Sequence, residues 1–205
     1  MLKSIAIFSI SFSLAFLILI VSIFRIAQIK YVFSQSPSPT PTSSNTPTIN
    51  YNLPYPGKIQ EDSVLWPLKA LRDKIWLTVT INPSKKAELY LLMADKRLAD
   101  SKSLFDKGSP DLGVAVLTKA EKYLEMAHLA ERAAHQKNMN TTDCLEKYTL
   151  ATLKHRQVID EILAIAPEDA KPLIVKTQDY PKNLYNEAKN GLFEAGLPAP
   201  QNPFN

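Results

Sequence analysis

The sequence predicts an all-α protein with three parts: an N-terminal transmembrane helix, a Pro/Ser/Thr-rich linker, and a bundle of four to five helices. An uncharged run opens the chain, a stretch of proline, serine and threonine follows, and the remainder has apolar residues at helical spacing. Only five glycines occur, against fifteen prolines, which disfavours an all-β fold with many tight turns. The predicted boundaries are 1–33, 34–58, 59–195 and a disordered tail over 196–205.

The uncharged run extends from Ile5 to Phe24. Its twenty residues would rise about 30 Å as a helix, which matches the hydrocarbon thickness of a bilayer, whereas a cleavable signal has a shorter apolar region. Length therefore favours a retained anchor. Cleavage at 32–34 is the alternative, although it would leave Arg25 and Lys30 between the apolar run and the cut. The predicted anchor residues are Ile5, Phe8, Leu14, Leu17, Ile20 and Phe24.

The formal net charge of +4 arises mainly near the N-terminus. Three of the 24 basic residues and none of the 20 acidic residues lie in the first 50 positions, which leaves 21 basic and 20 acidic residues beyond them. The basic balance therefore does not indicate nucleic-acid binding, which needs a basic patch within the folded part. Cys144 is the only cysteine, so an intrachain disulfide and a cysteine-based zinc site are excluded.

The linker over 34–58 holds few apolar residues before Leu53. Such a segment cannot bury enough surface to offset the entropy lost on ordering it. Repeated proline favours an extended form that reaches at most about 3.1 Å per residue, or roughly 70 Å in all. We interpret the linker as a passive stalk that holds a domain away from a surface, and a proline-rich ligand for another domain is the alternative.

Caps and apolar spacing predict the first two helices of the bundle. The first runs roughly from Trp66 to Val79, with Pro67 in an early helical position. The residues that share one of its faces are Leu68, Leu71, Ile75 and Val79. Asn82-Pro83 opens the second helix, and Gly108 ends it. Its seam alternates steps of four and three through Ala87, Leu91, Ala94, Leu98, Ser101 and Phe105.

Ser109-Pro110 restarts the chain at once, which predicts an antiparallel hairpin of the second and third helices. The third helix runs to about Lys137. Its seam is formed by Leu117, Ala120, Leu124, Ala127 and Ala134. Thr142-Asp143 begins a fourth helix. The last helical segment starts at Pro167, with a kink or short break expected at Pro181.

A series of short motifs follows the linker. They read Leu53-Pro54-Tyr55-Pro56-Gly57, Asp62-Ser63, Trp66-Pro67-Leu68-Lys69, Leu71-Arg72-Asp73, Lys85-Lys86-Ala87-Glu88-Leu89 and Ala94-Asp95-Lys96-Arg97-Leu98-Ala99. This order resembles a family of bacterial extracytoplasmic helical domains known as a domain of unknown function. The resemblance covers roughly 53–180. It implies an exported or surface-held helical domain in a bacterial envelope, and it supplies no catalytic residues.

Histidines and acids provide the remaining chemical candidates. Glu125 and His128 form a Glu-x-x-His pair of the kind used in di-metal bundles, but Thr152 stands where His155 would need an acid. We interpret His155 as a half-buried histidine with one nitrogen hydrogen-bonded. A stripe on the third helix is interpreted as a solvated face, and its members are Glu121, His128, Glu131 and His135. No catalytic, cofactor-binding or metal-binding residue is assigned.

A possible partner surface lies near the turn between the first two helices. Its residues are Trp66, Lys69, Arg72, Lys85 and Lys86. Tryptophan and arginine are good interface anchors, although the same residues could pack on the bundle and form ordinary surface ion pairs.

We therefore expect a non-enzymatic structural or binding module of the bacterial cell envelope, anchored by a single membrane pass with its domain outside the cytoplasm. Its expected partners are the lipid bilayer and a protein or envelope component, without cofactor or nucleic acid. Secretion is expected if the N-terminal segment is cleaved. One alternative is a metal-binding helical enzyme or sensor that uses Glu125, His128 and His155. Another is a membrane-linked signalling regulator, which the equal charge count on the two sides of the apolar run allows.

Overall fold

A computed structural model describes residues 12, 31–34 and 46–204. The predicted anchor residues and positions 35–45 of the linker lie outside the described residues. All regular structure in the described part is helical, which confirms the predicted bundle. Its helices are α2 (Trp66–Val79), α3 (Pro83–Asp106), α4 (Pro110–His135), α5 (Thr142–Ile165), α6 (Lys171–Thr177) and α7 (Asp179–Glu194). None of the helices within these residues has both the length and the hydrophobicity to span a membrane.

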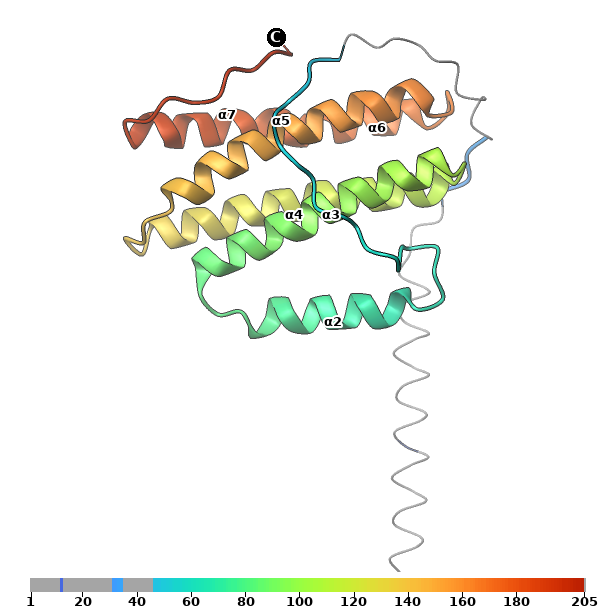
Figure 1. Cartoon of the computed structure of the whole chain (residues 1–205), viewed down its shortest axis with the longest axis horizontal. Coiled ribbons are helices and arrows are strands. Elements are labelled where there is room, and N and C mark those ends of the chain that lie inside the picture. The colour runs from blue at the N-terminus through green and yellow to red at the C-terminus, as the bar shows by residue number, and fades with distance from the viewer. Residues whose placement is uncertain (1–11, 13–30, 35–45, 205) are drawn as a thin grey trace, which may run out of the picture.

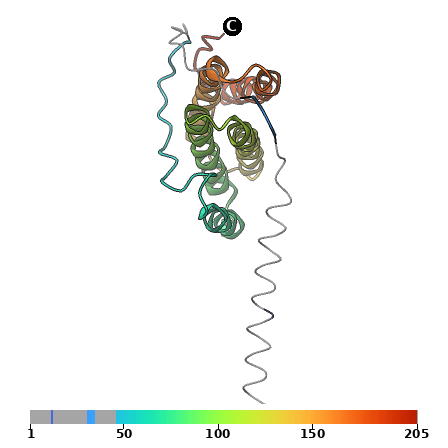
Figure 2. The ribbon, with the colours of Figure 1, turned by 90° about the vertical axis from the view of Figure 1, so that its right-hand side faces the viewer.

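The helices form three layers (Figure 1). The α3–α4 hairpin occupies the middle, α5, α6 and α7 cover one side of it, and α2 lies along the opposite edge. The view turned by 90° shows the same order, with α2 at the foot of the bundle and an extended segment running down its outside (Figure 2). Among the helices that the structure describes, only the middle layer therefore has neighbours on both of its sides.

The α3–α4 hairpin follows its predicted seam. Every seam residue named above for these two helices is buried. Asn82 caps α3 as expected, because its Oδ1 accepts a hydrogen bond from the Lys85 amide at 3.2 Å. Gly108 ends α3 with a φ of 75°, a conformation that costs glycine little. Gly113 lets the helices approach closely, since an added Cβ would lie 2.7 Å from the ring of Phe105.

The last helical segment breaks earlier than expected. Gln178 ends α6 and begins α7, three residues before Pro181. Pro181 lies in the first turn of α7, where a backbone N–H has no partner within the helix, so the missing donor costs little. The chain therefore turns at Gln178, and Leu184, Ala188 and Leu192 of α7 pack against α3, α4 and α5 in one core cluster.

The described part of the predicted stalk lies against the bundle. Residues 46–60, named the strap here, run along the outside of the layers (Figure 2). The Ile49 amide donates to Gln157 of α5 at 2.8 Å, and the Tyr51 hydroxyl donates to Asp95 of α3 at 2.5 Å. Leu53 packs against the core cluster of α3 to α6. Residues 46–58 are thus fastened to the domain, whereas the composition predicted a free spacer.

Residues 31–34, at the boundary between the predicted anchor and the linker, also contact the bundle. The Phe33 amide donates to Asp111 of α4 at 2.6 Å. Ser34 donates to Asp169 twice, from its amide at 2.8 Å and from its hydroxyl at 3.0 Å. Tyr31 and Phe33 stack on each other and pack against the core cluster. The chain therefore contacts the bundle at residues 31–34, ahead of most of the Pro/Ser/Thr-rich stretch.

The tail beyond Gly196 also packs on the domain, whereas the sequence predicted disorder there. Leu197 and Ala199 lie against the core cluster of α3, α4, α5 and α7. The Tyr185 hydroxyl donates to the Pro200 carbonyl at 2.6 Å, and Arg156 donates to the Phe204 carbonyl at 2.8 Å. Proline and small residues suggested a free end, but these apolar and hydrogen-bonded contacts hold it along α5 and α7.

Candidate functional site

Helix α2 begins and ends where the sequence predicts, but it buries a different face. Its buried residues, Trp66, Asp73 and Leu77, are spaced seven and four apart and form one narrow stripe. The residues expected to share an apolar face are all exposed, with exposed fractions of 69% for Leu68, 43% for Leu71, 54% for Ile75 and 65% for Val79. Trp76 is exposed to 46%. Most apolar side chains of α2 therefore face away from the bundle.

Trp66 anchors α2 to the middle layer. The Arg97 guanidinium lies 4.6 Å from the Trp66 ring centre and 5.4 Å from that of Tyr123, so it bridges α2, α3 and α4. Arg97 also pairs with Glu61 at 3.2 Å, and Lys119 of α4 reaches the same carboxylate at 3.0 Å. These buried and half-buried contacts hold the start of α2 firmly, although little of the helix surface is covered.

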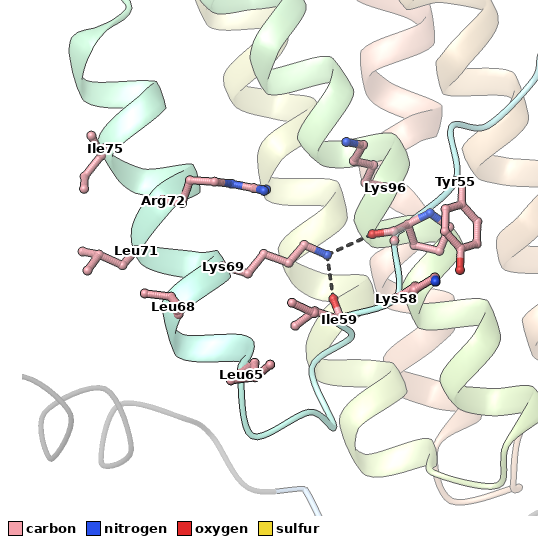
Figure 3. Close-up of a pocket in the computed structure, with 12 residues that line it drawn as sticks. Tyr55, Lys58, Ile59, Leu65, Leu68, Lys69, Leu71, Arg72, Ile75 and Lys96 are labelled. Atoms are coloured by element: carbon pink, nitrogen blue, oxygen red, sulfur yellow. Dashed lines mark hydrogen bonds between the residues drawn. The ribbon is translucent and has the colours of Figure 1, made fainter.

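A groove runs between α2 and the strap (Figure 3). Its volume is about 690 Å³. Its lining residues are Tyr55, Pro56, Gly57, Lys58, Ile59, Leu65, Leu68, Lys69, Leu71, Arg72, Ile75 and Lys96. Four of these twelve are basic and none is acidic, so the lining combines apolar side chains with positive charge. Figure 3 shows Leu71 and Ile75 extending from α2 away from Lys96 of α3, while Lys69 and Arg72 extend toward it.

Lys69 crosses the groove near the start of α2 and joins this helix to the strap. Its ammonium donates to the Pro56 carbonyl at 2.9 Å and to the Ile59 carbonyl at 2.8 Å (Figure 3). It also lies 5.1 Å from the Trp66 ring centre. Burial lowers the pKa of Lys69, and the charges of Asp100 and Asp73 oppose that shift. These bonds fix the separation between helix and strap, so the groove is built into the folded domain.

Asp100 of α3 lies behind this end of α2 with 2% of its surface exposed. Its Oδ1 has no hydrogen-bond partner in the protein. Burial raises the pKa of Asp100 to about 6, even though Lys69 and Arg97 favour its ionised form. Asp100 is thus a buried acid beside the basic groups that hold α2, and it does not line the groove.

The structure separates the predicted partner surface into two parts. Lys69 and Arg72 line the groove, and Trp66 lies beneath them as the buried anchor. Lys85 and Lys86 lie in the first turn of α3 and do not line the groove. Sequence reasoning missed Lys58 and Lys96, which lie on the strap and on α3 and are brought beside α2 by the fold.

A second polar cluster lies inside the bundle, centred on His155. This side chain is fully buried and uses both nitrogens: Nδ1 lies 2.7 Å from Glu121, and Nε2 lies 3.2 Å from Asp95. Burial alone would lower the pKa of His155, but the Glu121 charge and hydrogen bonds to Asp95 and Glu121 outweigh it and raise the pKa to about 9. The expectation of a half-buried histidine with one bonded nitrogen is therefore wrong.

The acidic and histidine stripe of α4 is also mostly inside. Glu121, His128 and Glu131 are buried, so the predicted solvated face is wrong for them, while His135 is exposed. His128 lies 2.9 Å from Glu187 of α7, and Glu131 accepts a bond from the Thr141 hydroxyl at 2.7 Å. Helix α7 and the α4–α5 turn thus supply partners for His128 and Glu131, while Glu121 Oε2 and His128 Nδ1 have no hydrogen-bond partner among the described residues.

The hypothetical metal set is not brought together. His128 contacts Glu187, and His155 contacts Glu121 and Asp95, whereas Glu125 points to solvent. Within the described ranges, no group of three or more His, Cys, Asp and Glu side chains is arranged to hold a metal ion.

Residues 58–169 match the model of a family described as "Domain of unknown function (DUF5667)". The chain belongs to the DUF5667 family. The matched range is more than half of the 205 residues and confirms the resemblance predicted from the motifs. No curated protein and no solved structure matches the chain in the same comparisons.

The DUF5667 match covers α2 to α5 and ends at Asp169, before α6. It includes the basic lining residues of the groove and the central cluster of Asp95, Glu121 and His155. The strap contacts of Ile49 and Tyr51 lie outside the matched range, as do α6 and α7. The candidate site is therefore built mainly from the DUF5667 domain itself.

Proposed function

We propose that this DUF5667 protein is a non-enzymatic binding module of the bacterial cell envelope. The N-terminal apolar run tethers it to the cell membrane, and the helical domain lies on the extracytoplasmic side. The uncovered apolar surface of α2, together with the adjoining groove, is the surface on which it binds. This last point carries the proposal, because a patch of contiguous exposed apolar residues marks an interaction site more often than a passive surface.

The contrast between α2 and the other helices supports this role. Leu91, Leu98 and Leu124 in the middle layer are covered almost completely. On α2, side chains of the same size remain exposed over the whole length of the helix. Full burial of such a side chain contributes about 1.5–3 kcal/mol, and a binding partner would recover the part of this free energy that the exposed surface forgoes. The anchoring contacts of Trp66 show that the helix is fixed in this position by the domain.

The chemistry of the groove also favours binding over catalysis. Its lining offers lysine, arginine and tyrosine side chains but no histidine, cysteine, aspartate or glutamate. General acid–base and nucleophilic catalysis need a base and a reacting group within hydrogen-bond reach of each other. The residues best suited to such chemistry, His155 and Glu121, are fully buried and are engaged with each other.

Site-specific photocrosslinking in the native host tests this proposal. A photoreactive phenylalanine analogue replaces Leu68 on α2 or, as a matched control, Phe193 on α7, which is 82% exposed on the opposite layer. We expect adducts with an envelope component from position 68 only. A C-terminal tag should also be cleaved by protease added to intact spheroplasts.

Two results would contradict the proposal. Equal adduct yields at positions 68 and 193 would mean that α2 has no special partner. A tag that resists external protease and is cleaved only after lysis would place the domain in the cytoplasm. Circular dichroism of both variants confirms that the helical domain is intact.

A further inference from the structure

We propose that the partner of α2 is an anionic lipid surface, and that the domain lies directly on the membrane with the apolar face of α2 in the headgroup region. This inference rests on the proposed function and identifies its partner. It joins three independent observations: the apolar side chains of α2, the sign of the charges around them, and the place where the chain attaches to the bundle.

The apolar surface has the form of an interfacial helix. Leu68, Leu71 and Ile75 project from the outer side of α2 (Figure 3). Val64 and Ile81, just beyond the two ends of the helix, are exposed to 94% and 88%. Because α2 lies along an edge of the bundle, its whole length can meet a flat surface without interference from another layer (Figure 1). Such a helix lies in the plane of a bilayer and buries its apolar side chains about 5–10 Å deep.

Trp76 adds an interfacial residue to the same helix. It is 46% exposed, in contrast to the buried Trp66. Tryptophan rings are enriched at membrane–water interfaces, because the indole is apolar over most of its surface and keeps one polar N–H. Helix α2 therefore exposes both aliphatic side chains and a tryptophan, the combination found at membrane–water interfaces.

The charges around this surface fit negatively charged headgroups. Residues 64–86 contain five basic residues and one acid, Asp73. Asp73 is buried and pairs with Arg72 at 2.6 Å. Lys58 and Lys96 add two more positive groups on the rim of the groove. An apolar helix with a basic border is the pattern that binds anionic bilayers, whereas a purely apolar partner would make no use of the excess positive charge.

The attachment point brings the domain within reach of the predicted membrane surface. The uncharged run ends at Phe24, and the chain is already bound to the bundle through Phe33 and Ser34. Tyr31 follows Arg25 by six residues, and six extended residues span at most about 20 Å. The Pro/Ser/Thr-rich stretch lies beyond this attachment point, between residues 34 and 46, so it does not separate the domain from the anchor.

A fluorescence experiment on the full chain tests this assignment. Cys144→Ser removes the only native thiol, and a single cysteine is then introduced by Leu68→Cys or, as the matched control, by Phe193→Cys. Each protein carries an environment-sensitive dye and is reconstituted into vesicles of phosphatidylcholine, with or without phosphatidylglycerol. Lipids that carry a nitroxide quencher at the headgroup–acyl boundary report contact with the bilayer.

We expect a blue shift and lipid quenching at position 68 in vesicles that contain phosphatidylglycerol, and neither effect at position 193. Lys85→Gln combined with Lys86→Gln removes two cations next to α2 without changing the groove lining. This change should lower the ratio of membrane-bound to released α2 by roughly 10- to 30-fold, since each cation near an anionic surface contributes about 1 kcal/mol. Added salt should act in the same direction.

Several outcomes overturn the proposal. Equal quenching at positions 68 and 193, or a chain that does not sediment with vesicles, would do so. So would a blue shift at position 68 that grows with protein density and ignores the lipid quencher, since that would indicate contact between copies. If quenching is absent but crosslinking from position 68 captures an envelope protein, the lipid assignment fails and the binding-module proposal stands.

Discussion

His155 and Glu121 meet in the middle of the bundle, with Nδ1 of the histidine 2.7 Å from Oε1 of the glutamate and neither side chain exposed to solvent. Asp95 forms a hydrogen bond with the other ring nitrogen of His155, and it also accepts one from the Tyr51 hydroxyl of the strap. One cluster therefore joins α3, α4, α5 and the strap. Isolated charges at this depth would be costly, but the histidine and the two acids compensate one another.

The first prediction concerns the pH dependence of stability. The folded-state pKa of His155 is raised to about 9 from 6.5, so its contribution is fully present below pH 6.5 and is lost as pH rises through about 9. We expect the free energy of unfolding to fall by up to roughly 3 kcal/mol across this window. Urea denaturation of the full chain in mild detergent measures it.

His155→Gln supplies the control for that prediction. It should lower stability at pH 7 by about 3–5 kcal/mol, because Asp95 and Glu121 lose their cationic partner. It should also remove most of the decline above pH 6.5. A variant that keeps the full decline would show that another group causes it.

The second prediction concerns the strap. Tyr51→Phe removes the hydroxyl that donates to Asp95 and should lower the free energy of unfolding by about 1–3 kcal/mol, because a buried carboxylate loses a donor. Faster hydrogen exchange at the Ile49 amide should accompany the loss. Tyr55→Phe is the matched control, since Tyr55 is 72% exposed, and its stability should stay within about 0.5 kcal/mol of the parent. Equal effects of the two substitutions would contradict the attachment of the strap through Tyr51.

The third prediction compares two helical glycines. Gly113→Ala places a methyl 2.7 Å from the Phe105 ring and should destabilise the domain by about 1–3 kcal/mol, despite the better helix propensity of alanine. At Gly191 the nearest atom is the end of the Leu145 side chain at 3.1 Å, which can move. Gly191→Ala should therefore be neutral or stabilising by up to about 1 kcal/mol. Thermal unfolding followed by circular dichroism measures the stability of both variants. A stabilised Gly113→Ala variant would contradict the close approach of α3 and α4 at Phe105.

The fourth prediction concerns Asp100. Its folded-state pKa of about 6 lies above the ordinary 3.8, so the stability that it contributes is greatest below pH 4 and is lost as pH rises through 6. Asp100→Asn should then raise the free energy of unfolding at pH 7 by roughly 1–2 kcal/mol, with no difference from the parent near pH 4. A loss of stability at pH 7 would instead show that attraction to Lys69 and Arg97 outweighs the cost of burying the charge.

Helix boundaries and the central seam were predictable because they depend on local chemistry. Asn82 and Gly108 mark the ends of α3 by a cap and a left-handed turn, and the alternation from Ala87 to Phe105 defines its buried face. These signals are contained within single helices. Periodicity also identified the apolar face of α2, but it cannot show whether another layer covers that face, and here none of the described helices does.

The interior polar cluster and the strap were missed for a different reason. Acids such as Glu121 are usually solvated. The burial of Glu121 is compensated by His155, which lies on a neighbouring helix and cannot be paired with it from sequence spacing. In the strap, a composition typical of disorder concealed a weak signal. Ile49, Tyr51 and Leu53 alternate with polar residues, which is the period of an extended segment with one buried side.

The height of the domain above the bilayer tests the central claim most directly. Energy transfer from a dye on Leu71→Cys, in the Cys144→Ser background, to acceptors in the membrane plane reports this height for the full chain in vesicles that contain anionic lipid. We predict a single short distance, because the apolar face of α2 would lie about 5–10 Å deep in the headgroup region. A broad distribution that extends toward about 70 Å, the reach of a free stalk, would contradict a domain lying on the membrane.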